Sequence, residues 1–243
     1  MGHNEFVPEV YSVPTDGAHP LVELPLLVVV GLTGVGKSSF ARALGWPLLP
    51  NRRELVDRFV LPRMGASPHE LDRTQRFQLT SRWRDAHPGG LAQLLATLHA
   101  PPVRPLVFDG LRGEEEVAYA RARFPRARFV VLEAPARVRL ERILGRRERF
   151  DRAKLRREEI AGFRKLAAGV IDQDELDGLL RLGYPLERLI AALKIVAEEQ
   201  AHYHPEGARR ALEGCSRALF LDTTAHTPED AAARVRAWLE GWS

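Results

Sequence analysis

The sequence contains 243 residues, of which 45% are hydrophobic and 28% are charged, and its formal net charge is +4. A chain of this kind can bury a full core as one domain, or as one domain with an insertion, without disulfides or a structural metal. Its single cysteine, Cys215, excludes an internal disulfide, and the apolar run at residues 26–30 is too short to span a bilayer. Since no basic segment and apolar signal core begin the chain, we expect a cytoplasmic protein with no membrane segment.

The first twenty residues lack a sustained hydrophobic period. They are interrupted by Pro8, Pro14, Gly17 and Pro20, so residues 1–20 are expected to form an irregular N-terminal extension. The folded core should begin after this segment.

Residues 26–38 carry the most informative pattern in the chain. Residues 26–30 are expected to form a buried strand, and residues 31–38, GLTGVGKS, fit the phosphate-binding pattern G-x-x-x-x-G-K-[ST]. The glycines Gly31, Gly34 and Gly36 let the backbone turn so that successive N–H groups point at one phosphate. The alternative interpretation is a glycine-rich turn that binds no ligand.

The motif assigns a role to each polar residue of this loop. Lys37 should contact the β- and γ-phosphates of a nucleotide, and the Ser38 hydroxyl should ligate Mg²⁺. Thr33, Val35 and Ser39 complete the expected nucleotide-binding set, for which ATP and Mg²⁺ are the predicted cofactors. Lysine is rare in this chain and occurs only at residues 37, 154, 165 and 194, whereas every other side-chain cation of this class is arginine. One of these few compact ammonium groups therefore lies where a phosphate is expected.

Helical spacing of apolar residues follows the loop. It predicts a helix at 38–44 and further helices at 53–61, 68–85 and 90–99, with a short second strand at 46–49.

Residues 104–109, RPLVFD, are expected to form a short apolar strand that ends in a carboxylate. Beside a phosphate loop, such a strand delivers its aspartate, here Asp109, to Mg²⁺ or to the water molecules around it. The alternative is that Asp109 only caps the turn and helix that follow.

The rest of the chain alternates between helices and strands. Helices are expected at 114–123, 138–149, 153–168, 174–182, 186–200, 205–214 and from 228 onward, and strands at 127–133 and 217–222. This order predicts an α/β fold with a mainly parallel, five-stranded sheet covered by helices on both faces. Ligands should bind beyond the carboxyl ends of its strands, where loop 31–38 and Asp109 both fall.

Several of these stretches together resemble the P-loop nucleoside and nucleotide kinases, and within them the dephospho-CoA-kinase-like and adenylate-kinase-like ATPases. Besides GLTGVGKS, the likeness is carried by LVDRFVLPRMG (55–65), VFDGLRGEEEV (107–117), VVLEAPARVRLERILGRRERFD (130–151) and FLDTTAHTPEDAAARV (220–235). The resemblance implies a three-layer P-loop NTPase sandwich with a helical lid or insertion. It divides the chain into a core at 21–150 with acceptor-binding helices at about 50–100, an insertion at 151–216, and a closing strand and helix at 217–243.

The resemblance also implies roles for residues outside the loop. Asp57, Arg58, Arg84 and Arg112 would hold the phosphoryl acceptor, and Asp109 would assist Mg²⁺ or the attacking hydroxyl. A second group would surround the nucleotide: Arg142, Arg146 and Arg147 would close over the transferred group, and Thr223, Thr224 and Ala225 would lie near the adenine. Guanidinium groups suit this task because they stay charged and are planar. The alternative is that these arginines form exposed ion pairs.

Three functions remain open at this stage. The first is ATP-dependent phosphoryl transfer to a small molecule such as a nucleoside, a nucleotide or a related hydroxyl compound. The second is a regulatory ATP-binding protein or ATPase, whose insertion would use its apolar face against its own subdomain, a second copy or another protein. The third is a polynucleotide kinase, suggested by arginines crowded into 121–157, although acidic residues are interspersed and few aromatic residues accompany them.

Overall fold

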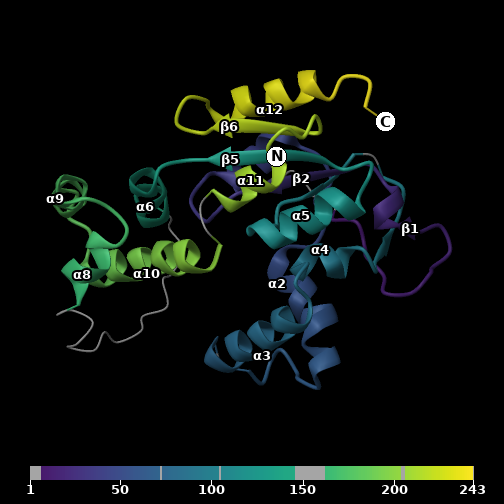
Figure 1. Ribbon diagram of the computed structural model, residues 1–243, viewed down its shortest axis with the longest axis horizontal. Helices are drawn as coiled ribbons and strands as arrows, with labels where there is room; N and C mark the ends of the chain where they lie inside the picture. The colour runs from purple at the N-terminus through teal and green to yellow at the C-terminus, as the bar shows by residue number, and fades with distance from the viewer. Residues whose placement is uncertain (1–6, 72, 104, 146–161, 204–205, 243) are drawn as a thin grey trace, which may run out of the picture.

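A four-stranded sheet lies at the centre of the computed structural model, which describes residues 7–71, 73–103, 105–145, 162–203 and 206–242 (Figure 1). The strands are β2 (Leu26–Val30), β4 (Leu106–Phe108), β5 (Arg128–Glu133) and β6 (Ala218–Asp222). They lie in the order β4-β2-β5-β6, and each neighbouring pair is parallel. The predicted α/β class with a mainly parallel sheet is therefore confirmed.

The prediction of a strand at 46–49, which would have given the sheet five strands, is wrong. In this segment Leu48 forms only an isolated parallel bridge with Val107, whose N–H donates to Pro47 O at 2.9 Å. Pro47 and Pro50 have no N–H to contribute to a ladder, so the segment passes the edge of the sheet without extending it.

A second, very small sheet forms where the sequence predicted none. It pairs β1 (His19–Pro20) with β3 (His99–Ala100) in antiparallel fashion, and Tyr11 adds a bridge to His99. The helix expected at 90–99 therefore ends early, as α4 (Gly90–Leu95). The N-terminal segment is anchored on the core, because Val10 is buried and Tyr11 N–H donates to His99 O at 2.9 Å.

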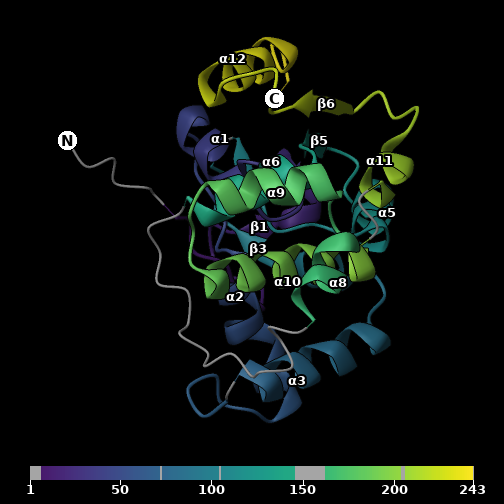
Figure 2. The ribbon, with the colours of Figure 1, turned by 90° about the vertical axis from the view of Figure 1, so that its left-hand side faces the viewer.

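Helices cover both faces of the larger sheet, and the apolar sequence of β2 explains this arrangement. Leu26, Val28 and Val30 pack in one apolar cluster with α4, α5 (Glu114–Arg123) and α11 (Gly207–Leu212). The alternate residues Leu27 and Val29 pack in another cluster with α1 (Lys37–Leu44) and α12 (Pro228–Trp238). Because side chains alternate between the faces of a strand, a strand that is apolar throughout requires cover on both sides. Figure 2 shows α12 at the top with α1 beneath it, and α10, α2 and α3 farther down.

Three short helical elements and one longer helix form an arm between loop 31–38 and β4. Asn51 caps α2 (Arg52–Leu55) in a capping box with Glu54, and the chain continues as the π-helical turn η2 (Val56–Val60) and the 3-10 turn η3 (Pro62–Met64). The arm ends with α3 (Arg73–Ala86), which begins later than the predicted residue 68. In Figure 1 this arm extends below the sheet.

The insertion builds its own apolar cluster against α6 (Ala136–Leu144). It contains α8 (Phe163–Ala168), α9 (Gln173–Arg181) and α10 (Leu186–Tyr203), and these helices gather on the left in Figure 1. Leu189, Leu193 and Val196 of α10 are buried there beside Leu140 and Ile143 of α6. The apolar face of α10 is thus covered within the chain. The predicted helical residues between 146 and 161 lie outside the described ranges.

Within the described ranges, no helix combines the length and apolarity that crossing a membrane requires.

Candidate functional site

Loop 31–38 joins the end of β2 to the start of α1 and is held tightly against α6. Gly34 has φ 88° and Gly36 has φ 100°, both in the left-handed region that favours glycine. A Cβ atom on Gly34 would lie 2.7 Å from the backbone oxygen of Arg139. This position therefore requires glycine both for its backbone conformation and for the close approach of α6.

Loop 31–38 presents backbone N–H donors beyond the carboxyl end of β2. In the part of the chain that the structure describes, the N–H groups of Gly34 and Gly36 have no hydrogen-bond partner. Gly36 is the N-cap of α1 and provides no side-chain cap, so the first N–H groups of this eight-residue helix are free as well. Together these groups and the helix dipole can bind an anion.

Lys37 lies among these donors. Its Nζ donates to Gly31 O at 2.6 Å and to Leu32 O at 3.1 Å, and no described carboxylate forms an ion pair with it. Burial, and after it the charge of Arg112, lower the pKa of Lys37 from 10.5 to about 7, while Asp109 and Glu199 oppose this shift. The ammonium therefore lacks an anionic partner in a site that disfavours its charge.

Glu199 of α10 places a carboxylate at the start of the loop. It accepts from Thr33 N at 2.9 Å, from Thr33 Oγ1 at 2.6 Å, and from Arg112 Nη1 at 2.9 Å. Arg139 Nη2 donates to it at 2.5 Å, and Arg139 Nε donates to Thr33 O at 2.8 Å. Burial lowers the pKa of Arg139, and the charge of Glu199 partly offsets this effect. The insertion is therefore joined to the loop by a buried ionic cluster.

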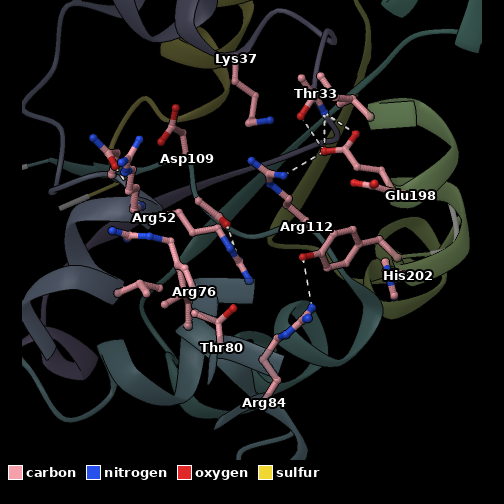
Figure 3. A pocket seen from close by; sticks show the side chains of 18 of the residues that line it. Thr33, Lys37, Arg52, Arg76, Thr80, Arg84, Asp109, Arg112, Glu198 and His202 are labelled. Atoms are coloured by element: carbon pink, nitrogen blue, oxygen red, sulfur yellow. Dashed lines mark hydrogen bonds and ion pairs between the residues drawn. The ribbon is translucent and has the colours of Figure 1, made fainter. Parts of the chain in front are cut away.

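A cavity of about 620 Å³ opens in front of the loop, with walls from three parts of the chain (Figure 3). The first wall holds Lys37, Ser38, Asp109 and Arg112, from the loops after β2 and β4. The second wall is the arm, which contributes Asn51, Arg52, Arg53, Arg76, Thr80, Trp83 and Arg84. The third wall is the end of α10, with Ile195, Glu198, Glu199, His202 and Tyr203. The insertion at 151–216 therefore forms part of this cavity through α10.

Most arginines of the arm are fixed by the protein's own groups. Arg52 Nη1 donates to Glu116 at 2.9 Å and to Gly110 O at 3.1 Å, and Arg76 pairs with Asp57. Burial raises the pKa of Glu116, but the charge of Arg52 and the hydrogen bonds from Arg52, Leu91 and Arg112 together lower the pKa overall. Arg84 differs from these, because its described contact is a 3.5 Å approach to the hydroxyl of Tyr203 and no described carboxylate pairs with it.

The residues present fit a magnesium ion that is shared with a ligand. Ser38 and Asp109 line the same cavity and offer the hard oxygen atoms that Mg²⁺ prefers. Among the described residues, no group of three or more His, Cys, Asp or Glu side chains could hold a metal. A magnesium ion bound here would therefore take most of its ligands from phosphate and water, as it usually does.

The residues predicted to hold an acceptor separate into two groups. Arg84 and Arg112 line the cavity, whereas Asp57 is not among its lining residues and holds Arg76. Arg58 is not in the cavity wall, because it points to the N-terminal segment and donates to Val10 O at 3.2 Å.

The residues predicted to surround a nucleotide are only partly brought together. Arg142 donates to Val35 O at 3.3 Å and to Thr223 Oγ1 at 2.7 Å, so it joins loop 31–38 to the loop after β6. In that loop Thr224 bonds Asp222 instead, Ala225 is exposed, and Ser39 is exposed on α1. Arg146 and Arg147 lie outside the described residues.

Sequence reasoning missed four of the residues that shape this site: Arg76, Glu116, Arg139 and Glu199. Arg76, Thr80 and Arg84 follow a four-residue spacing that places them on one face of a helix, so this row could have been recognised. Glu199 gives no local signal, because the threonine that it contacts lies 166 residues away in the chain.

No family model and no curated protein matches this chain. Among solved structures, it is similar to the unliganded crystal structure of a sugar kinase from Janibacter sp. HTCC2649, with a TM-score of 0.41 and 17% identity over 89% of this chain and 95% of that chain. It is also similar to TT1252 from Thermus thermophilus, with a TM-score of 0.42 and 18% identity over 91% and 99% of the two chains. At this level of similarity, neither protein indicates what this chain binds or catalyses.

Proposed function

We propose that the protein transfers a phosphoryl group from ATP, with Mg²⁺, to the hydroxyl of a small acceptor such as a nucleoside, a nucleotide or a related compound. The observation that carries this proposal is a single cavity in which Lys37 and the free loop amides lie on one wall and arginines of the arm on another. A site for phosphate and a site for an acceptor are thereby placed next to each other, as transfer requires.

The chain's own residues would supply positioning and charge. The amides of loop 31–38 and the Lys37 ammonium would bind the phosphate oxygens, with Lys37 giving up its contacts to Gly31 O and Leu32 O. Mg²⁺, held by Ser38 and Asp109, would neutralise charge on the transferred group. Asp109 also lines the cavity on the side of the arm, where its carboxylate could accept the proton of the acceptor hydroxyl.

The charges in the cavity favour an acceptor that carries an anionic group. Six cationic side chains line it, against the carboxylates of Asp109, Glu198 and Glu199. Arg84 stands out on the arm because no described carboxylate neutralises it, and the hydroxyls of Thr80 and Tyr203 line the same part of the cavity. A carboxylate or phosphate on the acceptor would provide the missing partner.

The direct test is to measure ADP formation with ATP, Mg²⁺ and matched pairs of acceptors, such as nucleosides with their monophosphates and sugars with their sugar acids. We expect turnover that depends on one acceptor and that favours the anionic member of its pair. ADP formation that is independent of every acceptor would support the regulatory ATPase instead, and absence of turnover with nucleotide bound would contradict phosphoryl transfer.

Arg84→Gln should raise the KM for the anionic acceptor by roughly tenfold to a hundredfold, because a charge-assisted contact contributes about 1.5–3 kcal/mol. The KM for ATP should change little. Arg82→Gln is the matched control, since Arg82 is exposed on the same helix and does not line the cavity. An equal effect of both variants would argue against an acceptor contact by Arg84.

The affinity for ADP should depend on pH through Lys37. Its pKa of about 7 means that the free protein loses the proton as the pH rises through 7, so binding above this pH requires proton uptake. Affinity should therefore fall between pH 7 and 9, by up to about tenfold per pH unit. Calorimetry in buffers with different ionisation enthalpies measures both effects. Lys37→Arg, whose charge persists, should flatten the profile, and a flat profile in the unmodified protein would contradict this role.

A further inference from the structure

The donors around Glu199 form a complete oxyanion site. A backbone N–H and a hydroxyl from Thr33 and guanidinium groups from Arg112 and Arg139 converge on one carboxylate whose side chain is 6% exposed. Arg139 itself is 2% exposed, so its charge is fixed in place rather than solvated. Such a set of donors binds a phosphoryl group as readily as a carboxylate.

Two features indicate that Glu199 does not fully satisfy this site. The first is charge, because two guanidinium groups face one carboxylate, whereas a terminal phosphoryl group carries more negative charge. The second is an unpartnered donor: Arg112 Nε is buried and has no hydrogen-bond partner among the described residues. A tetrahedral group with three free oxygen atoms offers more acceptors than a carboxylate does.

The location connects this site to loop 31–38. Thr33 directly precedes Gly34, whose N–H has no partner, so the carboxylate of Glu199 lies at the beginning of the row of amides that would bind a polyphosphate. Thr33, Lys37, Asp109 and Glu199 all line the same cavity. The donors of Thr33 are therefore accessible from the position where phosphates would enter.

We propose that the terminal phosphoryl group of a bound triphosphate takes the donors of Thr33, Arg112 and Arg139, and that Glu199 leaves them when it does. This inference rests on the proposed binding of ATP. Glu199 then competes only with the terminal phosphoryl group for these donors. A diphosphate therefore leaves the contact between Glu199 and Thr33 intact, whereas a triphosphate breaks it. The end of α10, which also provides Glu198 and Tyr203 to the acceptor cavity, then responds to the presence of that phosphate.

The test compares a non-hydrolysable ATP analogue with ADP by calorimetry. Glu199→Gln keeps the shape of the side chain but removes its charge, so the analogue should bind roughly fivefold to tenfold more tightly, while affinity for ADP stays within about twofold. Glu187→Gln is the control, since Glu187 is exposed on the same helix, does not line the cavity and should change neither affinity. Equal or weaker binding of the analogue by Glu199→Gln would overturn the inference and leave Glu199 as a residue that only holds the arginines in position.

Hydrogen exchange on the unmodified protein gives a second readout that does not depend on the variant. Amides in the last turns of α10 should exchange faster with the ATP analogue than with ADP, because the link between Glu199 and Thr33 is broken only by the triphosphate. Identical exchange with both ligands would contradict the exchange of Glu199 for phosphate. If neither nucleotide binds to any of these proteins, the proposed function fails and the inference fails with it. If both nucleotides bind but Glu199→Gln does not bind the ATP analogue more tightly, only the inference fails and the proposed function stands.

Discussion

Lys37→Ala should reduce acceptor-dependent ADP formation by at least about a hundredfold, because it removes a charged donor from the transferred group. Nucleotide affinity should fall as well, since no other lysine lines the cavity. The fold should be nearly unaffected: the site disfavours the Lys37 charge, and the side chain contacts only two backbone oxygens of its own loop. Steady-state kinetics and calorimetry measure the loss, and thermal unfolding checks the fold.

The control for this variant is Lys165→Ala. Lys165 is exposed on α8 and lies outside the cavity, so its replacement should leave turnover and affinity unchanged. If Lys37→Ala bound nucleotide as tightly as the unmodified protein, the role assigned to Lys37 would be refuted.

Glu116→Ala should lower the free energy of unfolding by about 3–5 kcal/mol, the range expected when one partner of a buried ion pair is removed. Glu116 accepts from Arg52 Nη1 at 2.9 Å, from Leu91 N at 3.2 Å and from Arg112 N at 3.3 Å, with 7% of its side chain exposed. Its loss leaves the Arg52 charge and two backbone donors without this partner. One carboxylate therefore joins the arm, the start of α4 and the loop after β4.

Urea unfolding at an unchanged m-value measures this effect. Glu115→Ala is the matched control, because Glu115 is the exposed neighbour on α5 and its loss should change stability by less than about 0.5 kcal/mol. A similarly small change for Glu116→Ala would show that the ion pair contributes little to the fold. The variant should also raise the KM for the acceptor, because Arg52 and Arg112 both contact Glu116 and both line the cavity.

The sequence by itself determined the elements whose information is local. The apolar run of β2, the glycines of loop 31–38 and the helical spacing of α1 are contiguous, so turn chemistry and periodicity were sufficient to predict them in order. Asp109 directly follows the short apolar strand β4, so its position at the end of that strand was also readable from the local sequence. The failed strand at 46–49 had an equally apolar pattern, but its prolines and its position at the sheet edge limited it to one bridge.

Only the tertiary structure decided which distant residues meet. The contact between Glu199 and Thr33 spans 166 residues, and that between Arg52 and Glu116 spans 64. Neither pair carries a periodic or turn signal, because a charged residue on a helix can face solvent or a partner with the same local sequence. The packing of α10 on α6 turns Glu199 toward loop 31–38, and the pairing of β4 beside β2 brings the loop after β4, with Asp109 and Arg112, to the mouth of the same cavity. The sequence thus predicted the order of β2, loop 31–38 and α1, whereas the packing of the insertion decided which residues face that loop.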